Sequence, residues 1–160
     1  MRSRMIVFLM ALLLQSQPLF TISRSTNANV VHYDARLMAS GSLDPTTPIV
    51  GYWIMLAEHG QREEFSGSEK KAAYGFTVMK ERSSDCYRMT LAANTTRPIQ
   101  VCSDHGSVRA EVTIDGHSAV LERMFIDIKG AAFWKSVEHI ELFGTDAETG
   151  ARLDEQIKPR

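Results

Sequence analysis

Apolar and polar residues alternate along most of the chain after residue 75. Because side chains on a β-strand point alternately to its two faces, this pattern is typical of strands with one buried face. It predicts strands over 76–80, 86–92, 108–114 and 118–129, a further strand ending at Phe143, and a polar edge strand over 152–157. Asp115-Gly116 predicts a tight hairpin turn between the strands at 108–114 and 118–129.

The first half of the chain predicts two strands and a helix. Residues 29–35 read as a short strand, and 49–57 are almost entirely apolar, as expected of a strand buried on both faces. Ser66 followed by Glu69 is a capping box, in which each side chain satisfies a backbone amide of the first helical turn. The sequence therefore predicts one short helix, at about 66–74, with Gly75 just past its end.

Consecutive hairpins with little helix predict a mainly β protein. We expect an antiparallel sandwich or an up-and-down barrel of about eight or nine strands, with the helix over one end or one face. No internal linker or repeat divides the chain, so we expect a single domain over residues 29–160.

The N-terminus has the pattern of a secretory signal peptide. Arg2 and Arg4 precede an uninterrupted apolar run over 5–14, which is too short to cross a bilayer, since that takes roughly 20 residues. Small residues predict cleavage after Ser23 or Ala28, so the leader covers 1–23 with its end between 23 and 28. Residues 24–28 are polar and are expected to form a loose leader to the domain. The alternatives are an uncleaved anchor and a buried helix. We expect a periplasmic or extracellular protein with no membrane span in its mature chain.

Cys86 and Cys102 are the two cysteines of the chain. A loop is predicted over 94–98, between the strand at 86–92 and its partner. If the cysteines lie opposite each other in an antiparallel pair, Arg88 faces Gln100, Thr90 faces Pro98, and the apolar side chains all fall on the other face. Directly opposed residues are close enough for a disulfide, which an oxidising compartment permits. The alternative is two free, buried thiols.

The charge balance argues against nucleic acid as a partner. The chain carries 18 basic and 19 acidic residues, a net charge of −1, and loss of Arg2 and Arg4 leaves 16 basic residues and a net charge of −3. No basic stripe is present to neutralise phosphates.

Four short motifs occur in order along the chain: N-V-V-x-Y from Asn29, Y-W-I from Tyr52, E-K-K-A-A-Y-G-F from Glu69 and L-F-G-x-D-x-x-T-G from Leu142. This ordered set resembles a bacterial domain-of-unknown-function family of small exported proteins. The resemblance covers nearly the whole mature chain. It implies an exported domain that stands alone, and it transfers no activity, cofactor or catalytic residue.

Motifs for nucleophilic or zinc chemistry are missing from the sequence. A hydrolase would require His32, Asp34 and Glu141 to converge on one cleft, and His32 with His139 is the pair most able to contribute to a metal site. The alternative is that these are outward-facing polar side chains. We expect no cofactor.

Aromatic and cationic residues suggest a binding surface near the helix. Tyr33, Tyr52, Trp53 and Tyr74, with Lys71, could line a concave site for a small molecule, a glycan or an envelope component. The alternative is that the aromatic rings belong to the core.

The sequence thus favours a non-catalytic binding module. The alternatives are the hydrolase described above and a structural or assembly protein that pairs through its exposed last strand. Asn94-Thr95-Thr96 is a glycosylation sequon, which matters only in a eukaryotic secretory pathway.

Overall fold

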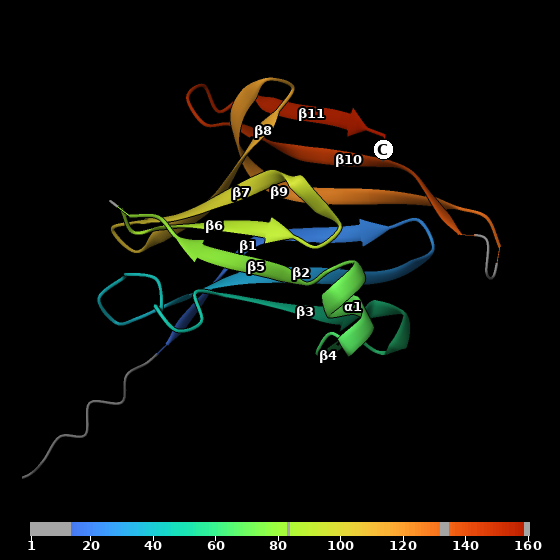
Figure 1. The fold of residues 1–160 in the computed structure, drawn as a ribbon, viewed down its shortest axis with the longest axis horizontal. Helices are drawn as coiled ribbons and strands as arrows, with labels where there is room; N and C mark the ends of the chain where they lie inside the picture. The colour runs from blue at the N-terminus through green and yellow to red at the C-terminus, as the bar shows by residue number, and fades with distance from the viewer. Residues whose placement is uncertain (1–13, 83, 132–134, 159–160) are drawn as a thin grey trace, which may run out of the picture.

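The computed structural model describes residues 14–82, 84–131 and 135–158, and Figure 1 shows how they are arranged. Eleven strands, one α-helix and one short 3-10 helix make up this part of the chain. The strands are β1 (Gln15–Arg24), β2 (Asn27–Leu37), β3 (Ile49–Met55), β4 (Gln61–Glu63), β5 (Phe76–Lys80), β6 (Cys86–Leu91), β7 (Asn94–Asp104), β8 (Ser107–Ile114), β9 (His117–Lys129), β10 (Ser136–Asp146) and β11 (Arg152–Ile157). The helices are η1 (Leu56–Glu58) and α1 (Gly67–Ala72).

The long strand β9 joins two layers of strands. Along one edge, its first half pairs with β8 and its second half pairs in parallel with β1, while β10 pairs along the other edge. One layer continues from β1 through β2 and β3 to β4, and the other continues from β8 through β7 and β6 to β5. β11 adds to the outer edge of β10.

The hydrophobic core fills the space between these two layers. In Figure 1, β5 and β6 lie in front of β1 and β2, and α1 lies at one end of the strands. Val31 and Tyr33 of β2 and Met89, Ile99 and Val101 of the opposite layer are completely or almost completely buried. The predicted mainly β class is confirmed as a sandwich-like pair of layers, with more strands than expected and one parallel pairing.

Local sequence signals predicted several features correctly. Cys86 lies opposite Cys102, and Arg88 lies opposite Gln100, as the alternation required. Val112 pairs with Ala119 across the Asp115-Gly116 turn. Ser66 and Glu69 form the complete capping box at the start of α1.

The hairpin between β6 and β7 differs from the prediction. A loop was expected over 94–98, but the turn is Ala92-Ala93 and Leu91 pairs with Asn94. Met89 pairs with Ile99, and Leu91 pairs with Asn94. Between these two pairs β6 advances by two residues and β7 by five. The three extra residues bulge out of β7, so the expected pairing of Thr90 with Pro98 is replaced by an irregular segment.

The start of the folded region also differs from the prediction. The domain was expected to begin at residue 29, with residues 24–28 as a loose leader, but β1 begins at Gln15 and lies between β2 and β9. A cut at residue 23 or 28 would remove most or all of this strand. Among the described residues, no helix is long and apolar enough to cross a membrane.

Candidate functional site

Three of the predicted ligand-binding residues lie inside the core. Tyr33, Trp53 and Tyr74 are at most 7% exposed, and Phe65 packs with all three. The Trp53 and Tyr74 rings meet edge to face with centroids 4.9 Å apart, and the Tyr33 hydroxyl donates to the Tyr74 carbonyl at 2.7 Å. Burial is the main cause that raises the pKa of Tyr33 above its ordinary value. These rings close one end of the sandwich, while Lys71 is exposed on α1.

An arginine and a glutamate that were not predicted as site residues contact this aromatic cluster. The Arg24 guanidinium lies 4.6 Å from the centroid of the Trp53 ring and donates to the Tyr74 hydroxyl at 3.2 Å. Glu69 accepts a hydrogen bond from the Trp53 indole at 3.1 Å as well as those of its capping box. Burial alone would raise the pKa of Glu69, but the hydrogen bonds from Ser66 and Trp53 and the charge of Arg24 outweigh it and lower that pKa.

Tyr52, His32 and Asp34 lie together on the outer face of the first layer. The Tyr52 hydroxyl donates to Asp34 Oδ2 at 2.7 Å, and its ring stacks on His32 with centroids 5.6 Å apart. The Arg62 guanidinium lies 3.5 Å from the Tyr52 centroid on the same face. Burial, together with the bond to Asp34, raises the pKa of Tyr52 to about 12. The tyrosine therefore stays protonated and donates to the carboxylate.

Glu141 lies with a different histidine, on β10. His139 Nε2 is 3.1 Å from a Glu141 oxygen, and His139 Nδ1 is 3.7 Å from Asp127 on β9. The strand order β2, β1, β9, β10 places three strand spacings, about 14 Å, between the backbones that carry His32 and Glu141. The register thus does not bring His32, Asp34 and Glu141 into one cleft, and the described residues contain no group of three side chains arranged to hold a metal ion.

A cleft of about 680 Å³ opens between the β6–β7 hairpin and the β10–β11 pair. Ile140 and Ile157, directly opposite each other, form its apolar floor, and Asn94, Lys158 and the bulged segment 95–97 form its polar rim. The bulged residues of β7 thus line one wall of the cleft. The volume is in the range of small-molecule sites, roughly 300–1,000 Å³.

The floor of the cleft continues inward toward the aromatic cluster. Arg24 lies opposite Ile126, Ile126 opposite Ile140, and Ile140 opposite Ile157, so these side chains share one face across four strands. The predicted aromatic residues do not line the cleft. They lie beyond its inner end, where Arg24 stacks on Trp53.

An ion pair joins the outer wall of the cleft to β11. Arg97 donates two hydrogen bonds to Glu155, at 2.6 and 2.8 Å, and Glu155 also accepts from the backbone of Asp115 at 2.8 Å. The Arg97 bond is the largest influence on the pKa of Glu155, and with the Asp115 bond it lowers that pKa despite partial burial. The carboxylate thus fastens the bulge of β7 and the β8–β9 turn to the same edge strand.

Replacing this carboxylate by its amide should destabilise the protein in a pH-dependent way. We expect Glu155→Gln to lower the free energy of unfolding by about 1 kcal/mol at pH 7, because the pair is only partly exposed and makes two bonds. A lowered pKa stabilises the fold above the unfolded value of about 4.5, and this contribution is lost as the pH falls through the folded value. The difference between the two proteins should therefore shrink below pH 4.5 in urea titrations. An equal difference at pH 7 and pH 3, or an equal effect of Glu148→Gln in an exposed turn, would contradict this assignment.

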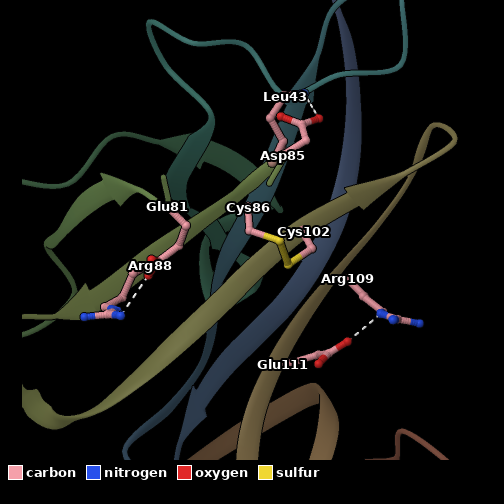
Figure 2. The surroundings of a disulfide bond; sticks show 8 residues. All are labelled: Leu43, Glu81, Asp85, Cys86, Arg88, Cys102, Arg109 and Glu111. Atoms are coloured by element: carbon pink, nitrogen blue, oxygen red, sulfur yellow. Dashed lines mark hydrogen bonds and ion pairs between the residues drawn. A yellow bond between two sulfur atoms is a disulfide. The ribbon is translucent and has the colours of Figure 1, made fainter. Parts of the chain in front are cut away.

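The predicted disulfide is present on the outer face of the second layer. Figure 2 shows Cys86 and Cys102 bridging β6 and β7, with the ion pairs Glu81–Arg88 and Arg109–Glu111 around them. Both cysteines are half-buried. The neighbouring Asp85 accepts from the Leu43 backbone at 3.2 Å, so the loop after β2 is tied to the start of β6. A disulfide fits an oxidising, exported environment.

Sequence comparison places the chain in a family without assigning it an activity. Neither the curated proteins nor the solved structures gave a match. One family matches residues 20–156, and this match begins inside β1 rather than at the expected domain start. The chain therefore belongs to the family described as Domain of unknown function (DUF4833).

Proposed function

We propose that this protein is an exported, non-catalytic domain that binds a small amphiphilic ligand in the cleft between the β6–β7 hairpin and the β10–β11 pair. The cleft itself is the observation that carries the proposal. Its isoleucine floor suits an apolar group, while the amide, hydroxyl and cationic groups on its rim suit a polar or anionic one. Export is supported by the disulfide and by the basic and apolar residues at the start of the sequence.

Side-chain chemistry favours binding over catalysis in the cleft. Arg97 is already neutralised by Glu155, so it holds the wall in place, and Lys158 is the exposed cation of the rim. His139 and Glu141 flank Ile140 on β10, so they point to the opposite face of the sheet from the cleft floor. The other histidine–carboxylate pairs, His105–Asp104 and His117–Asp146, lie outside the residues that line the cleft. A ligand in the cleft would therefore meet contact groups and no acid–base pair.

A fluorescent amphiphile tests the cleft directly. 8-Anilinonaphthalene-1-sulfonate carries an apolar ring system and one anionic group, so we expect it to bind the folded protein with enhanced fluorescence. Ile157→Glu places a carboxylate on the floor and should weaken binding by about tenfold, equivalent to about 1.4 kcal/mol. Val137→Glu introduces the same group on β10 at an exposed position outside the cleft and serves as the matched control.

Equal probe binding by all three proteins, or the same bound mass in all three, would count against this function. Equal affinity of the probe for the wild type and both variants would mean that it binds elsewhere. Native mass spectrometry of protein gently purified from its own host adds a second readout: a bound small molecule should be present in the wild type and in Val137→Glu, and absent from Ile157→Glu. Circular dichroism of each variant shows that the fold is retained.

A further inference from the structure

β1 belongs to the folded domain although its sequence overlaps the predicted export leader. Leu19, Phe20 and Ile22 are at most 9% exposed, and the strand pairs with β2 on one side and β9 on the other. In Figure 1 it lies among the other strands of its layer, at the centre of the molecule. Removing a strand that is paired along both edges would leave two rows of backbone groups without partners and open the core.

Both cleavage positions expected from the sequence conflict with this arrangement. A cut after Ser23 would remove all three buried side chains of β1. A cut after Ala28 would also remove Arg24, which stacks on Trp53 and bonds to Tyr74. The end of the leader must therefore lie before Leu19, the first buried residue of the strand.

We propose that the leader is removed by hydrolysis of the peptide bond between Ser16 and Gln17. This inference rests on the export part of the proposed function. Water adds to the Ser16 carbonyl carbon, the carbon–nitrogen bond breaks, and the products are a carboxylate on Ser16 and an α-ammonium on Gln17. Leader cleavage sites carry small residues one and three positions before the cut. Ser16 fills the first of these positions and is the one small side chain between the apolar run that ends at Leu14 and the buried Leu19, while Leu14 occupies the second.

The side chains before and after this bond differ in exposure and in their contacts with β8. Leu14, Gln15 and Ser16 are all exposed. Gln17, in contrast, is held by both ends of its side-chain amide, which donates to the Gly106 carbonyl at 2.6 Å and accepts from the Val108 backbone at 3.1 Å. The domain therefore retains its contacts with β8 when the chain begins at Gln17.

Asp34 gives a second reason for placing the cut here. This residue is 7% exposed, and its Oδ1 is the one buried side-chain oxygen or nitrogen of the described residues without a hydrogen-bond partner. Its Oδ2 accepts from Ser16 at 3.2 Å, so the start of β1 passes directly beside the carboxylate. The cut removes the Ser16 donor. The new α-ammonium of Gln17, one residue along, would replace this donor and supply a compensating charge to the Asp34 carboxylate.

The intact mass and N-terminal sequence of the exported protein test this inference. The full chain is produced in an exporting host and recovered from the exported fraction, and we expect residues 17–160 with one disulfide and a free α-amine. A chain that begins at Arg24 or Asn29 would overturn the proposed cut while leaving export intact. A chain that retains Met1 inside the cell would overturn export and the cut together. Loss of ammonia through cyclisation of Gln17 would confirm the bond and overturn the pairing with Asp34.

A matched pair of variants separates the competing sites. Ser16→Trp places a large side chain at the proposed position, and Ala28→Trp places the same side chain at one of the alternative positions, both on exposed residues. We expect Ser16→Trp to accumulate as an uncut precursor and Ala28→Trp to be processed like the wild type. The reverse pattern would overturn the proposal. Ser16→Ala keeps a small side chain and should be cut normally.

Discussion

Gly75→Ala should destabilise the protein by about 3 kcal/mol, the upper end of what overpacking a well-packed site costs. A Cβ at this position would lie well inside van der Waals contact of the Lys70 carbonyl oxygen and 2.7 Å from Lys70 Cα. These are backbone atoms of α1, so they cannot rotate away as a flexible side chain would. The chain turns tightly here because the amides of Ala73, Tyr74 and Gly75 all point to the Glu69 carbonyl.

The effect should spread beyond the helix. The Gly75 carbonyl accepts from the Ala92 amide at 2.8 Å, which joins the end of α1 to the β6–β7 turn. Tyr74 lies next to it and carries the contacts to Trp53, Tyr33 and Arg24. A displaced Gly75 therefore disturbs the helix end, the aromatic cluster and the hairpin beside the cleft at once.

Gly67→Ala is the matched control in the same helix. Nothing lies within 4 Å of a Cβ at Gly67, so the extra methyl group meets open space. Alanine also restricts the unfolded chain more than glycine does, and we expect a change of no more than about 0.5 kcal/mol, in the stabilising direction. Guanidinium chloride unfolding followed by circular dichroism measures both variants. Similar stabilities for the two would mean that the close approach at Gly75 does not exist.

The features that the sequence predicted correctly depend on residues close together in the chain. A capping box needs only Ser66 and Glu69, and the Asp115-Gly116 turn needs only two central residues. The pairing of Cys86 with Cys102 follows from alternation on either side of a short hairpin. In each case one local choice fixes the geometry, because side-chain direction repeats with period two in a strand and about 3.6 in a helix.

The features that it missed depend on distant pairing. β1 pairs with β9 about a hundred residues later, and nothing local in its sequence specifies that partner. Its apolar residues also follow the apolar run at the N-terminus, so leader and strand form one continuous pattern. The same reason explains Arg24: a charged residue in an expected leader gives no sign that it stacks on Trp53.

The cleft was missed for a related reason. The sequence placed a loop at 94–98, where the structure has a tight turn followed by a bulge. The predicted loop and the observed turn with its bulge contain the same polar residues, and only the pairing of Leu91 with Asn94 distinguishes the two arrangements. The opposite wall, from Ile140 and Ile157, comes from strands whose position beside the hairpin is set by tertiary packing. A binding site between elements remote in sequence has no spacing motif to reveal it.

Removing the disulfide should cost about 3 kcal/mol, as expected for a bridge that closes a loop of this length. The bridge joins residues 16 positions apart and restricts the unfolded chain, which is the main source of its stabilising effect in the loop-entropy description. β5 and β6 extend the second layer through the pairing of β6 with β7, so the bridge fastens the outer half of that layer. We expect the double variant Cys86→Ala, Cys102→Ala to unfold at a lower denaturant concentration, with a free energy of unfolding lower by about 3 kcal/mol.

A neighbouring pair on the same two strands provides the control. Arg88 and Gln100 face each other next to the disulfide, and replacing both with alanine removes a cross-strand contact and a salt bridge but no covalent link. Such contacts contribute about 1 kcal/mol or less each. A reducing agent should bring the wild type and the Arg88→Ala, Gln100→Ala variant to a lower stability and leave the cysteine-free protein unchanged. If the reductant has no effect on the wild type, the two thiols are not joined in the folded protein, and the support that the bridge gives to export is lost with it.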